Sequence, residues 1–260
     1  IVLPNSVVSV GETAFGWTAL KNVVIPESLT VLEAHLFYAC NDLISVKLPD
    51  GLENICDGAF YGCANLKNIN IPDGVKSIGE GAFYYCSNLQ MVDIPDSVVN
   101  IGAGAFNMYN TATYLTSVKL PAGINIISER MFIDCQKLQE VNIPDNVTTI
   151  ERQAFLRCKA LNSLEIPEGL TTIESYAFDG CENLQDIYYA GSKEQWDKIT
   201  IGSNNEPIIN ARIHFGKVTV PIESITLNKE TVTLKMAETL TLQATVAPEN
   251  ATNKAVTWTT

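Results

Sequence analysis

A proline followed eleven residues later by a phenylalanine recurs eight times along this chain of 260 residues. Successive prolines lie 22, 23, 23, 23, 26, 23 and 23 residues apart, so the unit has a nearly constant length. A period in the twenties is typical of a solenoid, whose stacked units bury an apolar face that no unit buries alone. We therefore expect function on an extended surface. The pairs are Pro4/Phe15, Pro26/Phe37, Pro49/Phe60, Pro72/Phe83, Pro95/Phe106, Pro121/Phe132, Pro144/Phe155 and Pro167/Phe178.

One unit, residues 66–89, shows what each position predicts. Ile69 and Ile71 alternate with polar residues, as in a short half-buried strand, and Pro72 ends this strand because proline cannot donate to a ladder. Gly79 and Gly81 permit a tight second bend, so we expect little regular helix on the side away from the strands. The recurring apolar positions, expected to form the core, are Val75, Ile78, Ala82, Phe83, Cys86 and Leu89.

The pattern L-x-x-I-x-I-P-x-x-V-x-x-I-G-x-x-A-F-x-x-C resembles the repeat of the BspA-like leucine-rich repeat family, over about residues 1–187. The resemblance implies an α/β fold: a right-handed leucine-rich-repeat solenoid with a curved parallel β-sheet on one face and short irregular or helical turns on the other. It also implies a surface protein of bacteria, or of some protists, and members are implicated in adhesion to host proteins or other cells. Thr18 and Tyr109 depart from the pattern by replacing cysteine, and the fifth unit is three residues longer, over 107–113, where we expect a bulge.

Two further segments follow the eight units. Residues 188–217 resemble the family's usual terminal segment and are expected to cap the solenoid, with a short amphipathic helix at Ser192–Trp196 that places Trp196 over the last rung. Residues 218–260 alternate apolar and polar residues at period two, which predicts strands at 222–227 and 234–246 and a turn at 248–250. This segment resembles the first half of a bacterial immunoglobulin-like domain of group two. Because the remaining strands of that module are missing, we expect a partial all-β tail that contributes little stability, in a piece of a longer surface protein.

Cysteine positions and charge narrow the class of protein. Six of the seven cysteines share one slot, three residues after the repeat phenylalanine, and only Cys56 lies elsewhere. Side chains in one slot of stacked rungs point in parallel, so we expect buried free thiols in place of disulfides. The net charge of -12 opposes nucleic-acid binding, and no apolar run is long enough for direct membrane insertion.

No catalytic, cofactor-binding or metal-binding residue can be assigned from the sequence. His35 and His214 are the only histidines, neither lies in a nucleophile motif, and no phosphate loop or close cysteine pair is present. Six of the eight residues after the repeat prolines are acidic. Carboxylates at such turn positions commonly accept hydrogen bonds from their own backbone, so we favour that role over a cation-binding site. We therefore expect no enzyme and no cofactor.

Two rows of residues are the candidate partner-binding surfaces. The position after the repeat phenylalanine holds tyrosine in three consecutive units, at Tyr38, Tyr61 and Tyr84, with Trp17 and Tyr85 one place further on. Tyrosine favours interfaces, although a brace between repeats explains the same row. The exposed strand position between the two ladder residues is chemically varied, with Lys47, Asn70, Asp93 and Lys119 as candidates, and a plain solvated face is the alternative there.

These observations predict a non-enzymatic, extracellular interaction or adhesion module on a bacterial cell surface, which binds through the sheet face or the tyrosines. The expected partners are host or bacterial surface proteins, or a glycan. The alternative is a purely structural spacer without a ligand of its own.

Overall fold

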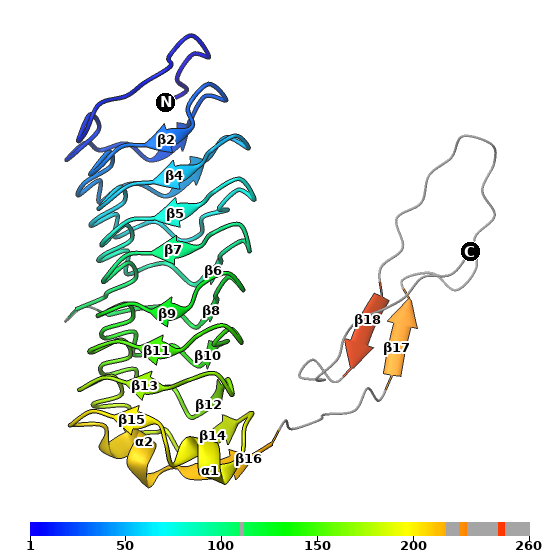
Figure 1. Ribbon diagram of the computed structural model, residues 1–260. Coiled ribbons are helices and arrows are strands. Elements are labelled where there is room, and N and C mark those ends of the chain that lie inside the picture. The colour runs from blue at the N-terminus through cyan, green and yellow to red at the C-terminus, as the bar shows by residue number, and fades with distance from the viewer. Residues whose placement is uncertain (110–111, 217–223, 228–243, 248–260) are drawn as a thin grey trace, which may run out of the picture. The chain divides into compact units, whose positions relative to one another are not determined.

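The structure is a computed structural model that describes residues 1–109, 112–216, 224–227 and 244–247 (Figure 1). It divides into two compact units, Ile1–Gly216 and Lys217–Thr260. The first unit is a solenoid of stacked rungs in which every strand pair is parallel, as the repeat predicts. Most rungs have strands on two sides and tight turns on the third.

The first ladder contains the strands that precede the repeat prolines and two further strands, β14 Asp186–Tyr189 and β16 Arg212–Phe215, which no repeat proline follows. It forms three separate parallel sheets, with side chains alternately exposed and buried. The strands are β1 Asn22–Val24 with β3 Ser45–Lys47; β6 Met91–Asp93, β8 Ser117–Lys119 and β10 Glu140–Val141; and β12 Ser163–Ile166, β14 Asp186–Tyr189 and β16 Arg212–Phe215.

The prediction of a strand at Ile69–Ile71 is wrong: no strand forms there, and the first ladder is interrupted between β3 and β6. Both isoleucines are still buried and Asn70 is exposed, so the rung keeps its core without its ladder. Asn68 and Asn70 flank Ile69, and asparagine is a poor strand former. Asparagine also shortens β10, which ends at Val141. The side-chain amide of Asn142 takes the place of backbone ladder bonds: Oδ1 accepts from Leu120 N at 2.7 Å, and Nδ2 donates to Leu120 O at 3.1 Å.

A second parallel ladder, made of two four-stranded sheets, lies on another side of the rungs, where we expected short irregular or helical turns (Figure 1). Two-residue strands form here because Ile78 and its equivalents are buried while the preceding residue faces outward. Gly79 sits at the end of such a strand, where a Cβ would lie 2.5 Å from Asp57 N, so glycine allows two rungs to approach. The strands are β2 Val31–Leu32, β4 Asn54–Ile55, β5 Ser77–Ile78, β7 Asn100–Ile101, β9 Ile126–Ile127, β11 Thr149–Ile150, β13 Thr172–Ile173 and β15 Thr200–Ile201.

The third side carries the repeat phenylalanines and is held by backbone bonds between rungs. Phe60 N donates to Ala82 O at 2.8 Å, and Phe83 N donates to Ala105 O at 2.8 Å. The residue two places before each phenylalanine has a positive φ, which turns the chain out of the second ladder. Glycine occupies this position in three consecutive rungs, at Gly58, Gly81 and Gly104.

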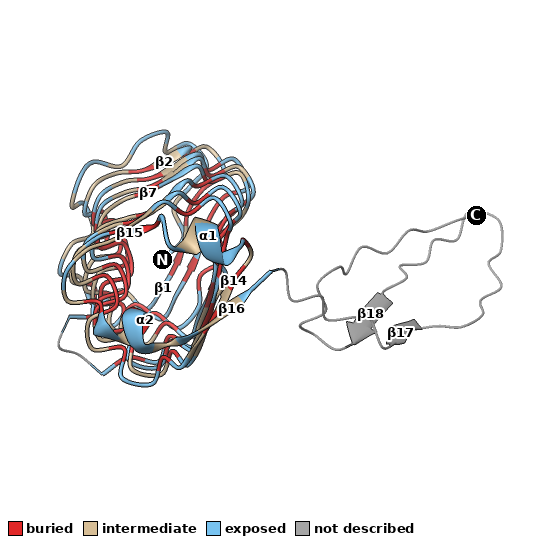
Figure 2. Cartoon of the chain, turned by 60° about the horizontal axis from the view of Figure 1, so that its bottom comes forward, coloured by how far each residue is buried: buried red, intermediate tan, exposed pale blue. Residues whose placement is uncertain are grey.

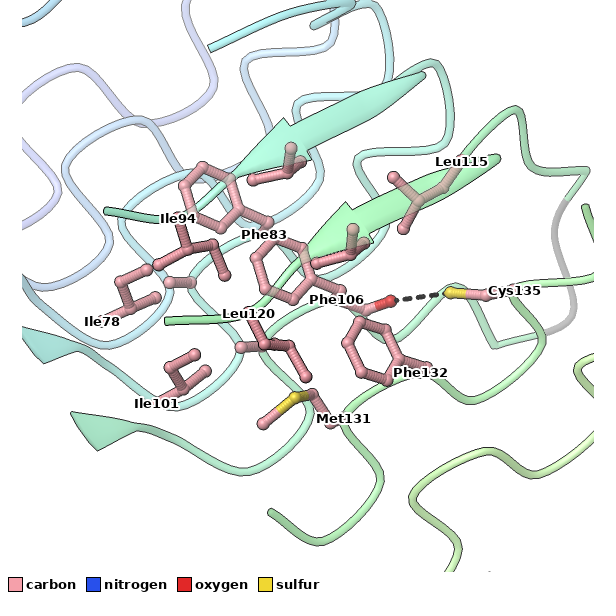
Figure 3. Packing of buried hydrophobic residues seen from close by; sticks show 14 of the residues in the cluster. Ile78, Phe83, Ile94, Ile101, Phe106, Leu115, Leu120, Met131, Phe132 and Cys135 are labelled. Carbon is pink, nitrogen blue, oxygen red and sulfur yellow. Dashed lines mark hydrogen bonds between the residues drawn. The ribbon is translucent and has the colours of Figure 1, made fainter. Parts of the chain in front are cut away.

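The core fills the space inside the rungs (Figure 2). Repeat phenylalanines stack from rung to rung, with 5.3 Å between the ring centroids of Phe83 and Phe106 and 5.8 Å between those of Phe106 and Phe132 across the longer fifth unit (Figure 3). Val75, Ile78, Ala82, Phe83, Cys86 and Leu89 are all buried, so the core positions predicted from the repeat are confirmed.

The six slot cysteines are buried free thiols, as expected, and Cys56 is free and partly exposed. Each slot thiol donates to the carbonyl oxygen of the phenylalanine in the preceding rung, as Figure 3 shows for Cys135 and Phe106, 3.3 Å apart. The other pairs are Cys40/Phe15, Cys63/Phe37, Cys86/Phe60, Cys158/Phe132 and Cys181/Phe155.

The C-terminal end of the first unit is closed by two short helices, α1 Lys193–Trp196 and α2 Glu206–Asn210 (Figure 1). Ser192 caps α1 in a capping box with Gln195, and Trp196 packs edge-on against Tyr189 with centroids 5.2 Å apart, so the expected short helix is present. Asn205 is fully buried and completes the third side: its Oδ1 accepts from Phe178 N at 2.9 Å, where a further rung would supply a carbonyl.

The second unit contains one described pair of antiparallel strands, β17 Ser224–Leu227 and β18 Ala244–Ala247, with Ile225 opposite Val246. The period-two pattern predicted strands at 222–227 and 234–246, and the described strands fall at the end of each range or one residue beyond it. The predicted turn at 248–250 lies outside the described residues.

Candidate interaction surfaces

Aromatic side chains form a continuous row over four consecutive rungs, on the turn that follows the buried phenylalanines. We call Trp17, Tyr38, Tyr61 and Tyr84 the aromatic strip. Tyr38 and Tyr61 stack with 4.9 Å between centroids, Tyr61 and Tyr84 with 4.8 Å and an angle of 2°, and Trp17 tilts against Tyr38 at 5.0 Å. The structure therefore brings the three predicted tyrosines together.

The strip is open to solvent at its edges. Trp17 is 70% exposed, and the three tyrosines are half-buried because each covers its neighbour's ring face. Tyr85 lies beside the strip and packs edge-on against Tyr84, with centroids 4.5 Å apart, and against Tyr61, with centroids 5.9 Å apart. Burial, the larger cause, and the neighbouring Tyr85 together raise the pKa of Tyr84 to about 12. The Tyr84 hydroxyl therefore stays protonated at neutral pH and can donate and accept hydrogen bonds.

A groove of about 400 Å³ runs beside Tyr61 and Tyr84. The positive-φ glycines Gly58, Gly81 and Gly104 line it without a side chain of their own, and the His35 ring lies against Gly58, where a Cβ would be 2.6 Å from His35 Cδ2. His35 and Arg130 stand at the rungs on either side of these glycines, and Asp57 and Glu80 line the groove as well. Sequence reasoning missed this groove, although three glycines at one repeat position were the available signal.

The sheet-face candidates Lys47, Asn70, Asp93 and Lys119 are all exposed. Asp93 and Lys119 are register partners and form an ion pair at 3.2 Å. Asn70, Asp93 and Lys119 line a second groove of about 420 Å³, together with Asp73 and Asp96. Lys47 pairs in register with Val24 and does not line this groove.

Two of the acidic residues that follow the repeat prolines bond the next rung. Glu27 Oε2 accepts from Asp50 N at 3.2 Å, and Asp96 Oδ1 accepts from Ala122 N at 2.9 Å. For these two, the expected bond to the residue's own turn is replaced by a bond between rungs. The reason is the parallel stacking, which places each turn beside the free N–H of its neighbour.

The longer fifth unit adds an aromatic residue beyond the strip. Tyr109 stands in the cysteine slot but points outward, 49% exposed, and the guanidinium of Arg157 lies over its ring at 5.5 Å. Arg157 also forms a bidentate pair with buried Asp134, with both distances 2.6 Å. Residues 110–111 of the expected bulge lie outside the described residues.

The two histidines contact aromatic rings. His35 lies 5.5 Å from Tyr38, and His214 stacks on Tyr188 at 4.7 Å and bonds Asp186 Oδ1 at 2.7 Å. The described part of the chain contains no group of three or more His, Cys, Asp or Glu that could hold a metal ion. Nor does any described helix have the length and apolar character needed to cross a membrane.

Comparison with known proteins identifies the family. The model for the BspA-type leucine-rich repeat region matches residues 1–111 and 107–210 with six copies, so the chain belongs to that family. The model for the group 2 bacterial immunoglobulin-like domain matches residues 221–260. Among curated proteins, none matches the chain.

Solved structures of bacterial leucine-rich repeat proteins share the fold. One from Bacteroides ovatus is 27% identical with a TM-score of 0.67, covering 83% of this chain and 60% of that one. The leucine-rich repeat protein of T. pallidum is 30% identical with a TM-score of 0.56, covering 71% of this chain and 77% of that one. The chain thus spans less than two thirds of the B. ovatus protein.

Proposed function

We propose that this chain is a non-enzymatic, extracellular interaction module that is displayed on a bacterial surface and acts in adhesion. Proteins of the BspA type are usually extracellular or attached to the cell surface, and leucine-rich repeat solenoids are in general non-enzymatic. The expected partner is a host or bacterial surface protein, or a glycan. The acidic charge of -12 argues against nucleic acid.

The aromatic strip is the observation that carries this proposal. Four large amphipathic side chains on consecutive rungs, one of them 70% exposed, form a rigid surface beside an open groove. Ordering such rings on binding costs little conformational entropy, because their neighbours already hold them in place. Tryptophan and tyrosine are also the residues most enriched among those that dominate binding energy at interfaces.

A structural spacer without a ligand is the second candidate. The observation that favours it is the face-to-face stacking of Tyr38, Tyr61 and Tyr84, which braces adjacent rungs whether or not a partner binds. A spacer requires no open groove beside the rings and no exposed tryptophan.

A binding screen of the full chain separates these candidates. The immobilised protein is presented with matrix proteins, bacterial surface proteins and a glycan array, and a thermal melt confirms that it is folded. Saturable binding to at least one class supports the interaction module. A folded protein that binds nothing in the screen contradicts that proposal and favours the spacer.

A further inference from the structure

A row of carboxylates runs beside the aromatic strip over the same four rungs. We call Glu12, Glu33, Asp57 and Glu80 the acidic row. Each precedes the phenylalanine of its rung by three or four residues. In the fifth rung the equivalent position holds Ala103, which interrupts the carboxylates where the strip ends, and acidic residues return in the next three rungs at Glu129, Glu151 and Glu174. Two chemically different rows therefore cover one stretch of the solenoid.

The carboxylates of the acidic row lie close to one another. Asp57 Oδ1 accepts from the backbone N–H of Glu80 at 2.8 Å. Cys56 has a raised pKa because of its burial first, and then because of Glu33, Asp57 and Glu12, so carboxylates from three rungs act on one thiol. Among the described residues, no lysine, arginine or histidine forms an ion pair with any member of the row. The row therefore presents uncompensated negative charge.

Two members of each row line the groove, Asp57 and Glu80 from the acidic row and Tyr61 and Tyr84 from the strip. Gly58 and Gly81, which directly follow the two carboxylates in the sequence, line it as well. A Cβ placed at Gly81 would lie 3.9 Å from Cδ2 of both tyrosine rings, so the edges of both rings lie close to Gly81. Arg130 at the far end is compensated by Glu129, 3.2 Å away.

This arrangement discriminates between classes of ligand. A sugar that stacks on aromatic side chains needs a free ring face, and both faces of Tyr61 are covered by Tyr38 and Tyr84. A lysine or arginine side chain has an apolar stem that packs against ring edges and a charged head that carboxylates attract. The groove offers those two contacts side by side.

We propose that the groove receives a lysine- or arginine-rich segment of a partner polypeptide, between the acidic row and the aromatic strip. This inference rests on the proposed interaction function and names the chemistry of its partner. The positive charge of such a ligand complements the net negative charge of the chain. The carboxylates of the groove concentrate that attraction at one site on the surface.

The test measures binding of a decalysine peptide to the full chain and to two variants with the same change of net charge. The groove variant carries Asp57→Asn and Glu80→Gln, in which Asn keeps the oxygen that accepts from Glu80 N. The control carries Asp73→Asn and Asp96→Asn, both on the sheet-face groove. We expect the groove variant to bind about tenfold more weakly at low salt, and the control about as well as the parent. Thermal melts confirm folding of both.

Each outcome decides the inference. An equal loss of affinity in both variants shows that net charge alone attracts the peptide, which overturns the proposed groove site. Decalysine binding that neither variant weakens overturns it as well. So does the absence of any decalysine binding. If the chain instead binds a glycan or a neutral protein with an affinity that Asp57→Asn and Glu80→Gln leave unchanged, the cationic ligand is wrong while the interaction function stands. A chain that binds nothing in any arm contradicts both.

Discussion

The thiol of Cys86 donates a hydrogen bond of 3.1 Å to the carbonyl oxygen of Phe60 in the preceding rung. Burial raises the pKa of Cys181 to about 12 and lifts those of Cys86 and Cys158 above their ordinary range, so these slot thiols stay protonated. We predict that the protein unfolded without reductant titrates as seven free thiols, and that in the native state iodoacetamide modifies the partly exposed Cys56 faster than the slot thiols, although its own raised pKa slows that reaction.

The native modification also reports on the fold. Alkylation of the six slot cysteines requires opening of the solenoid, so its rate should rise with urea while that of Cys56 changes less. Recovery of only one or two thiols from the unfolded protein would instead show disulfides between rungs.

Truncation of Phe83 should be strongly destabilising. Its ring is fully buried between Phe60 and Phe106, with centroids 5.3 Å away on both sides. We expect Phe83→Ala to lower the free energy of unfolding by about 3–5 kcal/mol, measured by urea denaturation. Met91→Ala is the control, since that side chain is 63% exposed and should change stability by no more than about 0.5 kcal/mol. Equal effects of the two substitutions would contradict the stacked core.

The repeat explains why so much of the core could be predicted. A fixed period forces equivalent residues to stack, so Ile78, Phe83 and Cys86 could be assigned to the interior without knowing the path of the chain between them. The second ladder could not be predicted in this way. A two-residue strand such as Ser77–Ile78 leaves no period-two pattern, and the spacing of Val75 and Ile78 reads as a bend.

The candidate site was predictable only in part. The stacking of Tyr38, Tyr61 and Tyr84 follows from their shared repeat position. The groove beside them depends on a positive φ two residues before each phenylalanine, a position that also holds Thr13, His35 and Arg130. The three glycines mark in the sequence the rungs that lack a side chain there, but because residues with side chains adopt the same conformation, the positive φ itself could not be predicted from the pattern.

Asp186 should make the cap sensitive to acid. Hydrogen bonds from His214 first, and then from Arg212, hold the pKa of Asp186 below its ordinary value. A depressed pKa in the folded state contributes stability above the unfolded pKa, and that stability is lost as the pH falls through the folded value. We expect Asp186→Asn to lower the urea midpoint at neutral pH, and the difference from the parent to disappear in acid.

The control for this prediction is Asp197→Asn, which removes an exposed pair with Lys193 and should change stability little. A loss from Asp186→Asn that is the same at neutral and acid pH would show that the substitution acts through packing, not through charge.

The first unit should fold without the second. The chain divides after Gly216, and the cap of the first unit is complete by then, with Asn205 bonded to Phe178 and β16 ending at Phe215. We predict that truncation after Gly216 leaves the melting temperature within a few degrees, since about 1 kcal/mol shifts a domain of this size by roughly 2–4 °C. Loss of the cooperative transition would show that residues 217–260 stabilise the solenoid.

The central claim, recognition of a partner through the aromatic strip, is tested most directly by comparing two variants against one ligand from the screen. The strip variant carries Tyr38→Ser, Tyr61→Ser and Tyr84→Ser, and the sheet-face variant carries Lys47→Glu and Asp93→Lys. Both are first shown to be folded by a thermal melt. The account predicts that the strip variant loses binding while the sheet-face variant retains the parent's affinity. Loss of binding in the sheet-face variant alone, or full binding by both, would contradict it.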